Sequence, residues 1–332
     1  MTRKVFCVCI ATILAVTISF AAASAAPKIK VTFSSIGYLY TPFFVAHDLG
    51  FFKENGLEIE EVRTGSGSKA AMIVISGDAQ YYLGTIDKIT KAKEKGKDLL
   101  AVCAMMTRMG STLAIRKGVK PGIEELPLKE RVPQIKGLKI GVTGRGSGTD
   151  ILARYIITHY SDLDPERDVN LMPIGKSSAY YAAMKTNKVD IVVRSEPVPA
   201  YCVHNFGARY FVDIIGGEIP FFSDYLYISV IGRKDYIEQN PDITRAFVKG
   251  VVKAERLIRD EPDKALGVMK ARMPKVDPGL HDLIWKSHRL AYAPDGVITK
   301  SGVDAGQEFI LFLEKVKKKY PFDEIATNKY LP

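Results

Sequence analysis

The sequence lacks the short motifs that mark common catalytic and metal sites. Neither H-E-x-x-H nor, beyond the N-terminal leader, C-x-x-C occurs, and the five histidines are scattered, so a zinc site is not indicated. No serine lies in a G-x-S-x-G turn, which argues against a serine hydrolase. Only Cys103 and Cys202 follow the leader; two cysteines do not make a disulfide scaffold, and the sequence leaves open whether they pair. We therefore expect no catalytic residue, no metal and no cofactor.

Long apolar runs are also scarce, since only the N-terminus carries one. Basic residues at 3–4 precede this run and Ala-Ser-Ala at 23–25 follows it, a pattern typical of a secretory signal peptide cleaved after Ala25. A membrane anchor is the alternative. No later stretch reaches the ~18 uninterrupted apolar residues needed to span a bilayer. We expect cleavage of residues 1–25 and export to the periplasm.

Charge is biased toward basic residues, with a formal net charge of +10. Lysine-rich blocks at 91–97 and 315–319 carry much of the excess, and such blocks are more often solvated helix faces than binding surfaces. Basic and aromatic residues do not form a shared patch, which argues against nucleic acid as a partner. We expect a monomer that binds no nucleic acid.

Strand-like and helix-like segments alternate through the first two thirds of the chain, which favours parallel sheets covered by helices. The last third is helical, with prolines at the expected starts and stops, and we expect it to pack on a sheet without site chemistry of its own. Strands are predicted at 28–34, 57–63, 80–85, 99–105, 111–116, 138–143, 169–174, 189–194, 209–215 and 225–232; helices are predicted at 43–53, 68–76, 85–95, 148–160, 178–186, 197–206, 242–259, 262–272, 278–291 and 301–319.

A weak internal repeat suggests two similar lobes. Residues 65–85 align without a gap on residues 175–195, and each segment has a Gly/Ser loop, an apolar helix, a short turn and a strand with a polar end. Two ordinary αβ units of equal length are the alternative. Open α/β sheets bind ligands at the carboxyl ends of their strands, where these polar residues would lie. Segments 103–118 and 216–232 are expected to be paired crossover strands. Lobe 1 is therefore predicted at 26–115 and 222–332, and lobe 2 at 116–221.

The loop in KIGVTGRGSGTD (139–150) is a candidate for binding an anion. It fails both the P-loop and the G-x-G-x-x-G patterns, so a nucleotide is not indicated. Thr143, Ser147 and Thr149 supply hydroxyls beside the free N–H groups of a helix start, which favours an anion. The alternative is that a hydroxyl only caps the helix, and Asp150 would repel an anion placed nearby.

Aromatic and cationic residues supply further candidates. Tyr38, Tyr40 and Phe43 lie where a strand gives way to a helix and could form an apolar wall with hydroxyl tips, or could pack in the core. An arginine could bind a carboxylate or sulfonate through two parallel hydrogen bonds, although a surface position is the commoner one. Glu196 could accept a hydrogen bond from a ligand amine or a pyrimidine. The remaining candidates are Arg108 and Arg145, either of which could clamp a carboxylate or sulfonate in this way, and Phe221 and Tyr225, whose large side chains would lie near the expected cleft.

Two stretches together resemble a known family. TPFFVAHDLGFFKENGLEIEEV (41–62) and IKGLKIGVTGRGSGTDILARYII (135–157) are similar to segments of the periplasmic substrate-binding proteins of ABC importers. The subgroup is the one that serves nitrate, sulfonates, taurine and thiamine pyrimidine precursors. LDPERDVNLMPIG (163–175) and KVDIVV (188–193) complete the pattern, and the resemblance extends from about 28 to 260.

This resemblance implies a two-lobe α/β fold of the periplasmic-binding-protein type (type II-like), with crossover hinge strands and a solute trapped between the lobes. It also implies delivery of that solute to the membrane permease of an importer that a cytoplasmic ATPase drives. Carried over by position, the residues that the resemblance places around the solute are Ser35, Tyr38, Tyr40, Ser66, Ser68, Thr85, Thr143, Ser147, Thr149, Ser195 and Glu196.

We therefore expect an exported solute-binding protein, not an enzyme, that captures a small organic anion such as a sulfonate or carboxylate. Three alternatives stay open: a binder of a pyrimidine or thiamine precursor, a sensory receptor that presents solute to a membrane kinase, and an enzyme on the same fold. Gln80 stands where the family usually has Asp, and the family's enzymes carry a cysteine-rich motif that is absent here. The sequence does not identify the solute.

Overall fold

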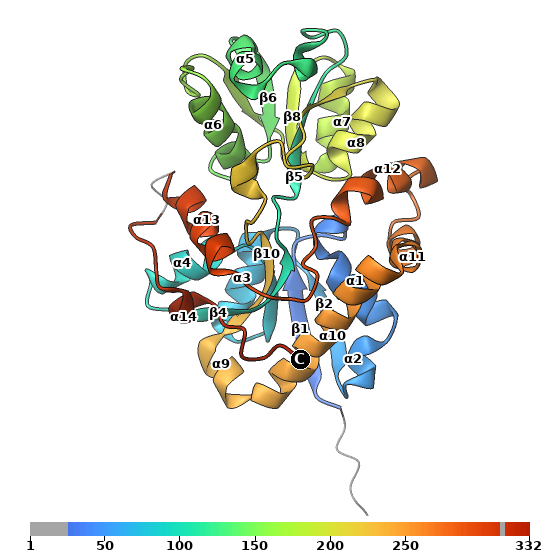
Figure 1. Ribbon diagram of the computed structural model, residues 1–332, viewed down its shortest axis with the longest axis vertical. Helices are drawn as coiled ribbons and strands as arrows, with labels where there is room; N and C mark the ends of the chain where they lie inside the picture. Colours follow the sequence, from blue (N-terminus) through green and yellow to red (C-terminus); the bar gives the residue numbers. More distant parts are fainter. Residues whose placement is uncertain (1–25, 313–315) are drawn as a thin grey trace, which may run out of the picture.

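The computed structural model describes residues 26–312 and 316–332 and contains two five-stranded sheets with helices packed around them (Figure 1). The predicted leader and its cleavage site lie outside the described residues. The first sheet has the order β2-β1-β3-β10-β4 and the second the order β7-β6-β8-β5-β9. The strands are β1 (Lys28–Phe33), β2 (Glu58–Arg63), β3 (Tyr81–Gly84), β4 (Leu99–Met106), β5 (Ser111–Ile115), β6 (Lys139–Val142), β7 (Asn170–Pro173), β8 (Ile191–Ser195), β9 (Arg209–Val212) and β10 (Ile228–Arg233).

The two sheets share one internal arrangement. The strand β1 pairs in parallel with β2 and β3, and β6 pairs in parallel with β7 and β8. In each sheet the next strand, β10 or β5, is antiparallel to both of its neighbours. The helix α3 (Gly67–Ser76) with β3 therefore corresponds to α7 (Ser177–Lys185) with β8, and these are the segments of the internal repeat. The expected two-lobe α/β fold is confirmed.

The chain crosses between the sheets twice. From β4 it passes through residues 107–110 to β5, and from β9 it returns through residues 213–227 to β10. The two crossing segments are joined, because the backbone N–H of Tyr225 donates to the Thr107 carbonyl at 2.9 Å. This arrangement supplies the hinge that a two-lobe binding protein requires.

One predicted boundary is wrong. Residues 111–115 form β5, which pairs with β8 and β9 in the second sheet, whereas the sequence analysis assigned them to lobe 1. All five residues of β5 are buried, so its sequence shows no polar face and does not indicate which of two sheets it joins. The first crossing therefore lies at 107–110, before β5 rather than after it.

The C-terminal third is helical as predicted, but it links the lobes instead of covering only the first. The helix α10 packs on α1 and α2, and α14 packs on β4, all in the first lobe. In contrast, α12 contacts α8 of the second lobe, and Phe309 of α13 packs 5.5 Å from Tyr155 of α6. The helices named here are α1 (Thr41–Asp48), α2 (Phe51–Glu54), α6 (Gly148–Tyr160), α8 (Val198–Phe206), α10 (Pro241–Asp260), α12 (Pro278–His288), α13 (Lys300–Leu311) and α14 (Phe322–Ile325).

Aromatic rings fill the core between the first sheet and its helices. Phe43 is fully buried and packs on Phe33 at 5.8 Å and on Phe52 at 5.7 Å, while Phe52 stacks on Phe247 of α10 at 4.7 Å. Such pairs add stability beyond the burial of apolar area. Phe43 is therefore a core residue and not the solute-facing wall that was predicted. Within the part of the chain that the structure describes, no helix combines the length and hydropathy required to cross a bilayer.

Candidate functional site

Strand ends from both sheets meet where the chain crosses between the lobes (Figure 1). The strands β3 and β4 are both antiparallel to β10, so their carboxyl ends lie at one edge, from which the first crossing leaves. The crossing enters β5 at Ser111, which pairs with Ser195 at the carboxyl end of β8. We call this region the interlobe junction: the last residues of β1, β3, β6 and β8 and the residues that follow them, together with the crossing residues 107–111 and 225–227.

On the first-lobe side, Tyr40 lies near this junction but Tyr38 turns into the protein. The Tyr40 hydroxyl pairs with Ser34 Oγ at 2.8 Å, and the neighbouring Ser35 is exposed. The Tyr38 side chain is fully buried, and its hydroxyl pairs with Nδ1 of His281 at 2.5 Å. The predicted role of Tyr38 as a cover for the solute thus conflicts with its position. The histidine that holds it comes from α12, in the tail that was expected to carry no site chemistry of its own.

The other first-lobe candidates differ in accessibility. Ser66 is partly buried just before α3, and Ser68 is exposed in its first turn. The Thr85 hydroxyl follows β3 and donates to the carboxylate of Asp87, which Lys88 contacts as well. Burial alone would raise the pKa of Asp87, but the adjacent lysine charges lower it well below its usual range. Thr85 is therefore already engaged by a permanently charged carboxylate.

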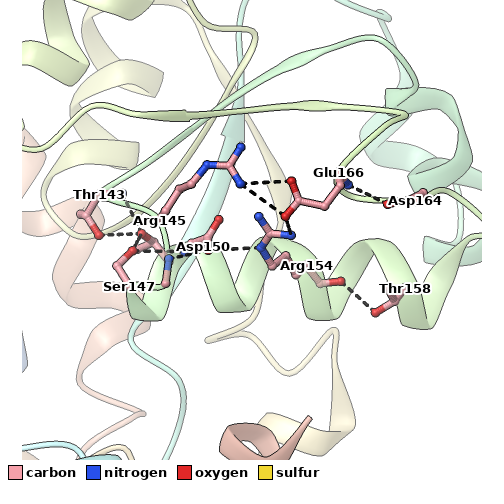
Figure 2. Close-up of polar contacts among 10 residues, drawn as sticks. Thr143, Arg145, Ser147, Asp150, Arg154, Thr158, Asp164 and Glu166 are labelled. Atoms are coloured by element: carbon pink, nitrogen blue, oxygen red, sulfur yellow. Dashed lines mark hydrogen bonds and ion pairs between the residues drawn. The ribbon is translucent and has the colours of Figure 1, made fainter. Parts of the chain in front are cut away.

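The hydroxyl groups of the glycine loop after β6 hydrogen-bond to one another and to the loop backbone (Figure 2). The Thr149 hydroxyl accepts from the Thr143 backbone N–H at 2.8 Å, and it pairs with the hydroxyls of Thr143 at 2.8 Å and Ser147 at 3.0 Å. Ser147 Oγ also accepts from the Asp150 N–H at 3.4 Å, which makes it the N-cap of α6. The Asp150 carboxylate accepts from the Gly146 N–H at 2.7 Å. The loop before α6 thus already holds a carboxylate of the protein itself.

Neither arginine proposed as a clamp has a free guanidinium. Arg145 is exposed and pairs with Glu166 at 3.1 Å, where Arg154 also pairs at 2.7 Å (Figure 2). Arg108 donates to the Ile215 carbonyl at 3.0 Å and so ties the first crossing to the return segment. Both guanidinium groups have structural partners.

The residues after β8 are buried to different extents. Glu196 is 6% exposed, and its carboxylate accepts from the Ala200 N–H at 2.9 Å and from the Tyr210 hydroxyl at 3.2 Å. Burial raises the pKa of Glu196 to about 7, against the opposing effect of those two hydrogen bonds. Ser195 is partly exposed at the junction. Tyr225 is buried against Phe222, with ring centroids 5.3 Å apart, so it belongs to the aromatic core of the crossing.

Two residues at the junction were absent from the predicted set. Arg194 lies in β8 directly before Ser195, and its guanidinium lies 5.8 Å from the ring centre of Tyr180 in α7. Within residues 26–312 and 316–332, this guanidinium makes no hydrogen bond and no ion pair. The Tyr180 hydroxyl is buried and has no hydrogen-bond partner among the same residues. A charged residue in the otherwise apolar strand IVVRS was the signal that could have identified Arg194.

One group of side chains offers possible metal ligands, and the two cysteines after the leader could in principle form a disulfide. His47, Asp48 and Glu61 bring possible ligand atoms within 4.8 Å of one another, but Arg272 fills the group, with Nη2 at 2.5 Å from Asp48 and 2.6 Å from Glu61. A cation already neutralises these carboxylates, so the group does not fit a metal. The two cysteines after the leader are both buried and free, which answers the question that the sequence left open.

A comparison with protein families identifies the chain. The model of the NMT1-like family matches residues 22–271, which is most of the sequence. The chain belongs to the NMT1-like family. The relatives of this NMT1-like protein confirm the resemblance to substrate-binding proteins that the sequence motifs indicated.

The protein YtlA of Bacillus subtilis (strain 168) is 21% identical over 91% of this chain and 88% of its own length. The nitrate/nitrite binding protein NrtA of Nostoc sp. is 24% identical over 70% of this chain, which spans only 56% of NrtA. The 4-amino-5-hydroxymethyl-2-methylpyrimidine phosphate synthase THI11 of Saccharomyces cerevisiae is 23% identical over 76% of the chain and 72% of the enzyme. Among solved structures, the periplasmic aliphatic sulphonate binding protein SsuA of Escherichia coli matches with a TM-score of 0.70, at 16% identity, over 92% of this chain and 99% of SsuA. This last likeness shows the fold.

Proposed function

We propose that this NMT1-like protein is an exported solute-binding protein that captures a small organic anion between its lobes and delivers it to the permease of an ABC importer. The observation that carries the proposal is the interlobe junction, where strand ends of both sheets meet beside two hydrogen-bonded crossings. Open α/β sheets bind ligands at such edges. The nitrate-binding and sulphonate-binding relatives support an anionic solute.

Binding would act by closing the lobes. A solute that touches both lobes binds the closed arrangement better and shifts the population toward it. The contacts that change are those between the lobes away from the crossings, such as His204 of α8, whose Nε2 lies 3.9 Å from a carboxylate oxygen of Asp277 beside α12. Both side chains are exposed, so this contact costs little to break or to remake.

Location and partners follow from the same proposal. The leader at residues 1–25 would direct the chain to the periplasm and be removed after Ala25, leaving a monomer that meets the permease. Recognition of a pyrimidine precursor, a sensory role and catalysis remain the competing functions. Product formation by the purified protein would favour catalysis. The similarity to the synthase THI11 is the reason to test for it.

A thermal-shift screen tests the proposal. We would measure the melting temperature of the protein with nitrate, bicarbonate, aliphatic and aromatic carboxylates, sulfonates and pyrimidines, and would record small-angle scattering for every compound that stabilises it. A true ligand at 100 times its Kd adds about 2.7 kcal/mol to the free energy of unfolding. We expect a carboxylate or sulfonate to raise the melting temperature and to reduce the radius of gyration. If no compound stabilises the protein, the proposed function is wrong; stabilisation without any change in scattering would contradict lobe closure alone.

A further inference from the structure

The backbone of β8 directs Arg194 toward the helices α7 and α8. Side chains alternate across a strand, and Val192 packs with Tyr180, Val198 and Cys202 in the cluster between β8 and those helices. Arg194 is two residues further along the same face, at the carboxyl end of the strand and therefore at the interlobe junction. It is partly exposed there.

The charge of Arg194 acts on several tyrosines. Burial raises the pKa of Tyr40, Tyr180 and Tyr227, and the positive charge of Arg194 opposes that shift in all three. The guanidinium lies 5.8 Å from the ring centre of Tyr180, and its charge also acts on Tyr40 of the first lobe and on Tyr227 of the return crossing. Partial burial of a cation without a counter-charge is unfavourable, and proteins usually pair such a group with a carboxylate. Here no carboxylate of the described chain pairs with it.

The Tyr180 hydroxyl lies at the same strand edge and is also unsatisfied. Its ring crosses Gly141 of β6, where a Cβ would be 3.4 Å from Cε1 of Tyr180. The hydroxyl approaches Thr149 closely enough for that contact to oppose the rise in the pKa of Tyr180, but the Thr149 oxygen already has three partners in the glycine loop, so the contact is not a full hydrogen bond. A fully buried hydroxyl without a partner costs stability unless another group completes it.

The first lobe faces these two groups with tyrosines. The hydroxyl of Tyr227 in the return crossing pairs with Ser111 Oγ at 3.2 Å, and Ser111 is paired in the sheet with Ser195, the residue after Arg194. Tyr40 comes from the loop after β1. A solute placed against Arg194 would thus contact groups carried by both sides of the hinge.

We propose, on the premise of the proposed function, that Arg194 and the Tyr180 hydroxyl bind the oxyanion of the solute, a carboxylate or sulfonate, while Tyr40 and Tyr227 contact it from the first lobe. A guanidinium can donate two parallel hydrogen bonds to such a group. Tyr180 donates a third, because a tyrosine hydroxyl is protonated at neutral pH and can donate. The glycine loop, whose hydroxyls bond to one another and which already holds the Asp150 carboxylate, is then not itself the anion site.

The test uses calorimetric titration of the full mature protein. Benzoate, phenylacetate, ethanesulfonate and taurine are the charged probes, and benzamide and phenylacetamide are uncharged matches for the first two. Arg194→Gln should weaken binding of the charged probes by about 10- to 150-fold, the effect of losing a hydrogen bond to a charged group. Arg145→Gln is the matched control, since that arginine is exposed and pairs with Glu166, and it should leave Kd unchanged.

Tyr180→Phe separates a binding role from a structural one. Within the described residues the hydroxyl approaches only the Thr149 hydroxyl, which other groups already satisfy, so its removal should change the urea midpoint little while binding of the same probes weakens several-fold or more. If Arg194→Gln fails to fold, Arg194→Lys and Tyr180→Phe decide. Unchanged Kd in the folded variants, or amides that bind as tightly as their acids, would overturn the inference and leave the proposed function intact. Failure of the wild-type protein to bind any probe here or in the thermal-shift panel would overturn both.

Discussion

Replacing Ser147 by alanine distinguishes a helix cap from an anion site in the glycine loop. Ser147 Oγ accepts from the Asp150 N–H at 3.4 Å and pairs with the Thr149 hydroxyl at 3.0 Å, and both contacts are internal to the loop (Figure 2). Loss of an N-cap costs ~0.5–2 kcal/mol. Because the capping bond is long, we expect Ser147→Ala to lower the free energy of unfolding by about 0.5–1 kcal/mol, and to change solute affinity by less than about twofold.

Urea unfolding and calorimetric titration of this one variant give both numbers. Thr158→Ala is the matched control on the same helix, since Thr158 is exposed and bonds only to carbonyls one turn back. Alanine is the better helix former, so the control should be neutral or slightly stabilising. A tenfold loss of affinity in Ser147→Ala at unchanged stability would refute the reasoning and return the anion to the loop.

Two further predictions concern stability. Burial raises the pKa of Glu196 from 4.5 to about 7, so between those pH values the folded protein binds more protons than the unfolded chain, and its free energy of unfolding should fall as pH rises. Urea unfolding at pH 5 and pH 8 should show that Glu196→Gln removes about 1–3 kcal/mol of this pH dependence. The same change in unfolding free energy between the two pH values in both proteins would contradict the prediction. Gly141→Ala should cost ~1–3 kcal/mol, because its Cβ would lie 3.1 Å from Ile174 and 3.4 Å from both Tyr180 and Val189, whereas Gly144→Ala, with open space around it, should be nearly neutral in the same measurement.

The order of strands and helices could be predicted because the signals are local. Each of the ten predicted strands has a counterpart, with ends that differ by a few residues. The errors in the predicted elements lie where contacts between residues far apart in the sequence decide the structure. The predicted helix at 43–53 divides at Gly50, whose φ of +79° ends α1 before Phe51 begins α2. The strand at 111–116 was placed in the wrong lobe because a fully buried segment fits either sheet.

The site was harder to predict because residue type does not reveal which partner a side chain has already taken. Tyr38 and Tyr40 are two residues apart in one short loop, yet Tyr38 pairs with a histidine 243 positions later in the chain. That histidine is in α12, which looked like plain packing in the sequence. Arg108 and Arg145 had the right chemistry for a clamp, but a carbonyl and a glutamate occupy them.

The partners that these side chains already have favour a solute site on the strand β8 rather than in the glycine loop. A helix start attracts an anion only while its N–H groups are free, and at α6 the Asp150 carboxylate takes the Gly146 N–H while Arg154 balances its charge. Arg194 differs because its backbone is paired with Thr112 of β5 at the end of a strand that β5 and β6 flank, while its guanidinium is unpaired. A rigid strand that carries an unsatisfied cation to the hinge positions an anion more accurately than a flexible loop. If the solute binds at Arg194 as we propose, the binding energy would act directly on the two segments that join the lobes, and recognition would be coupled to closure.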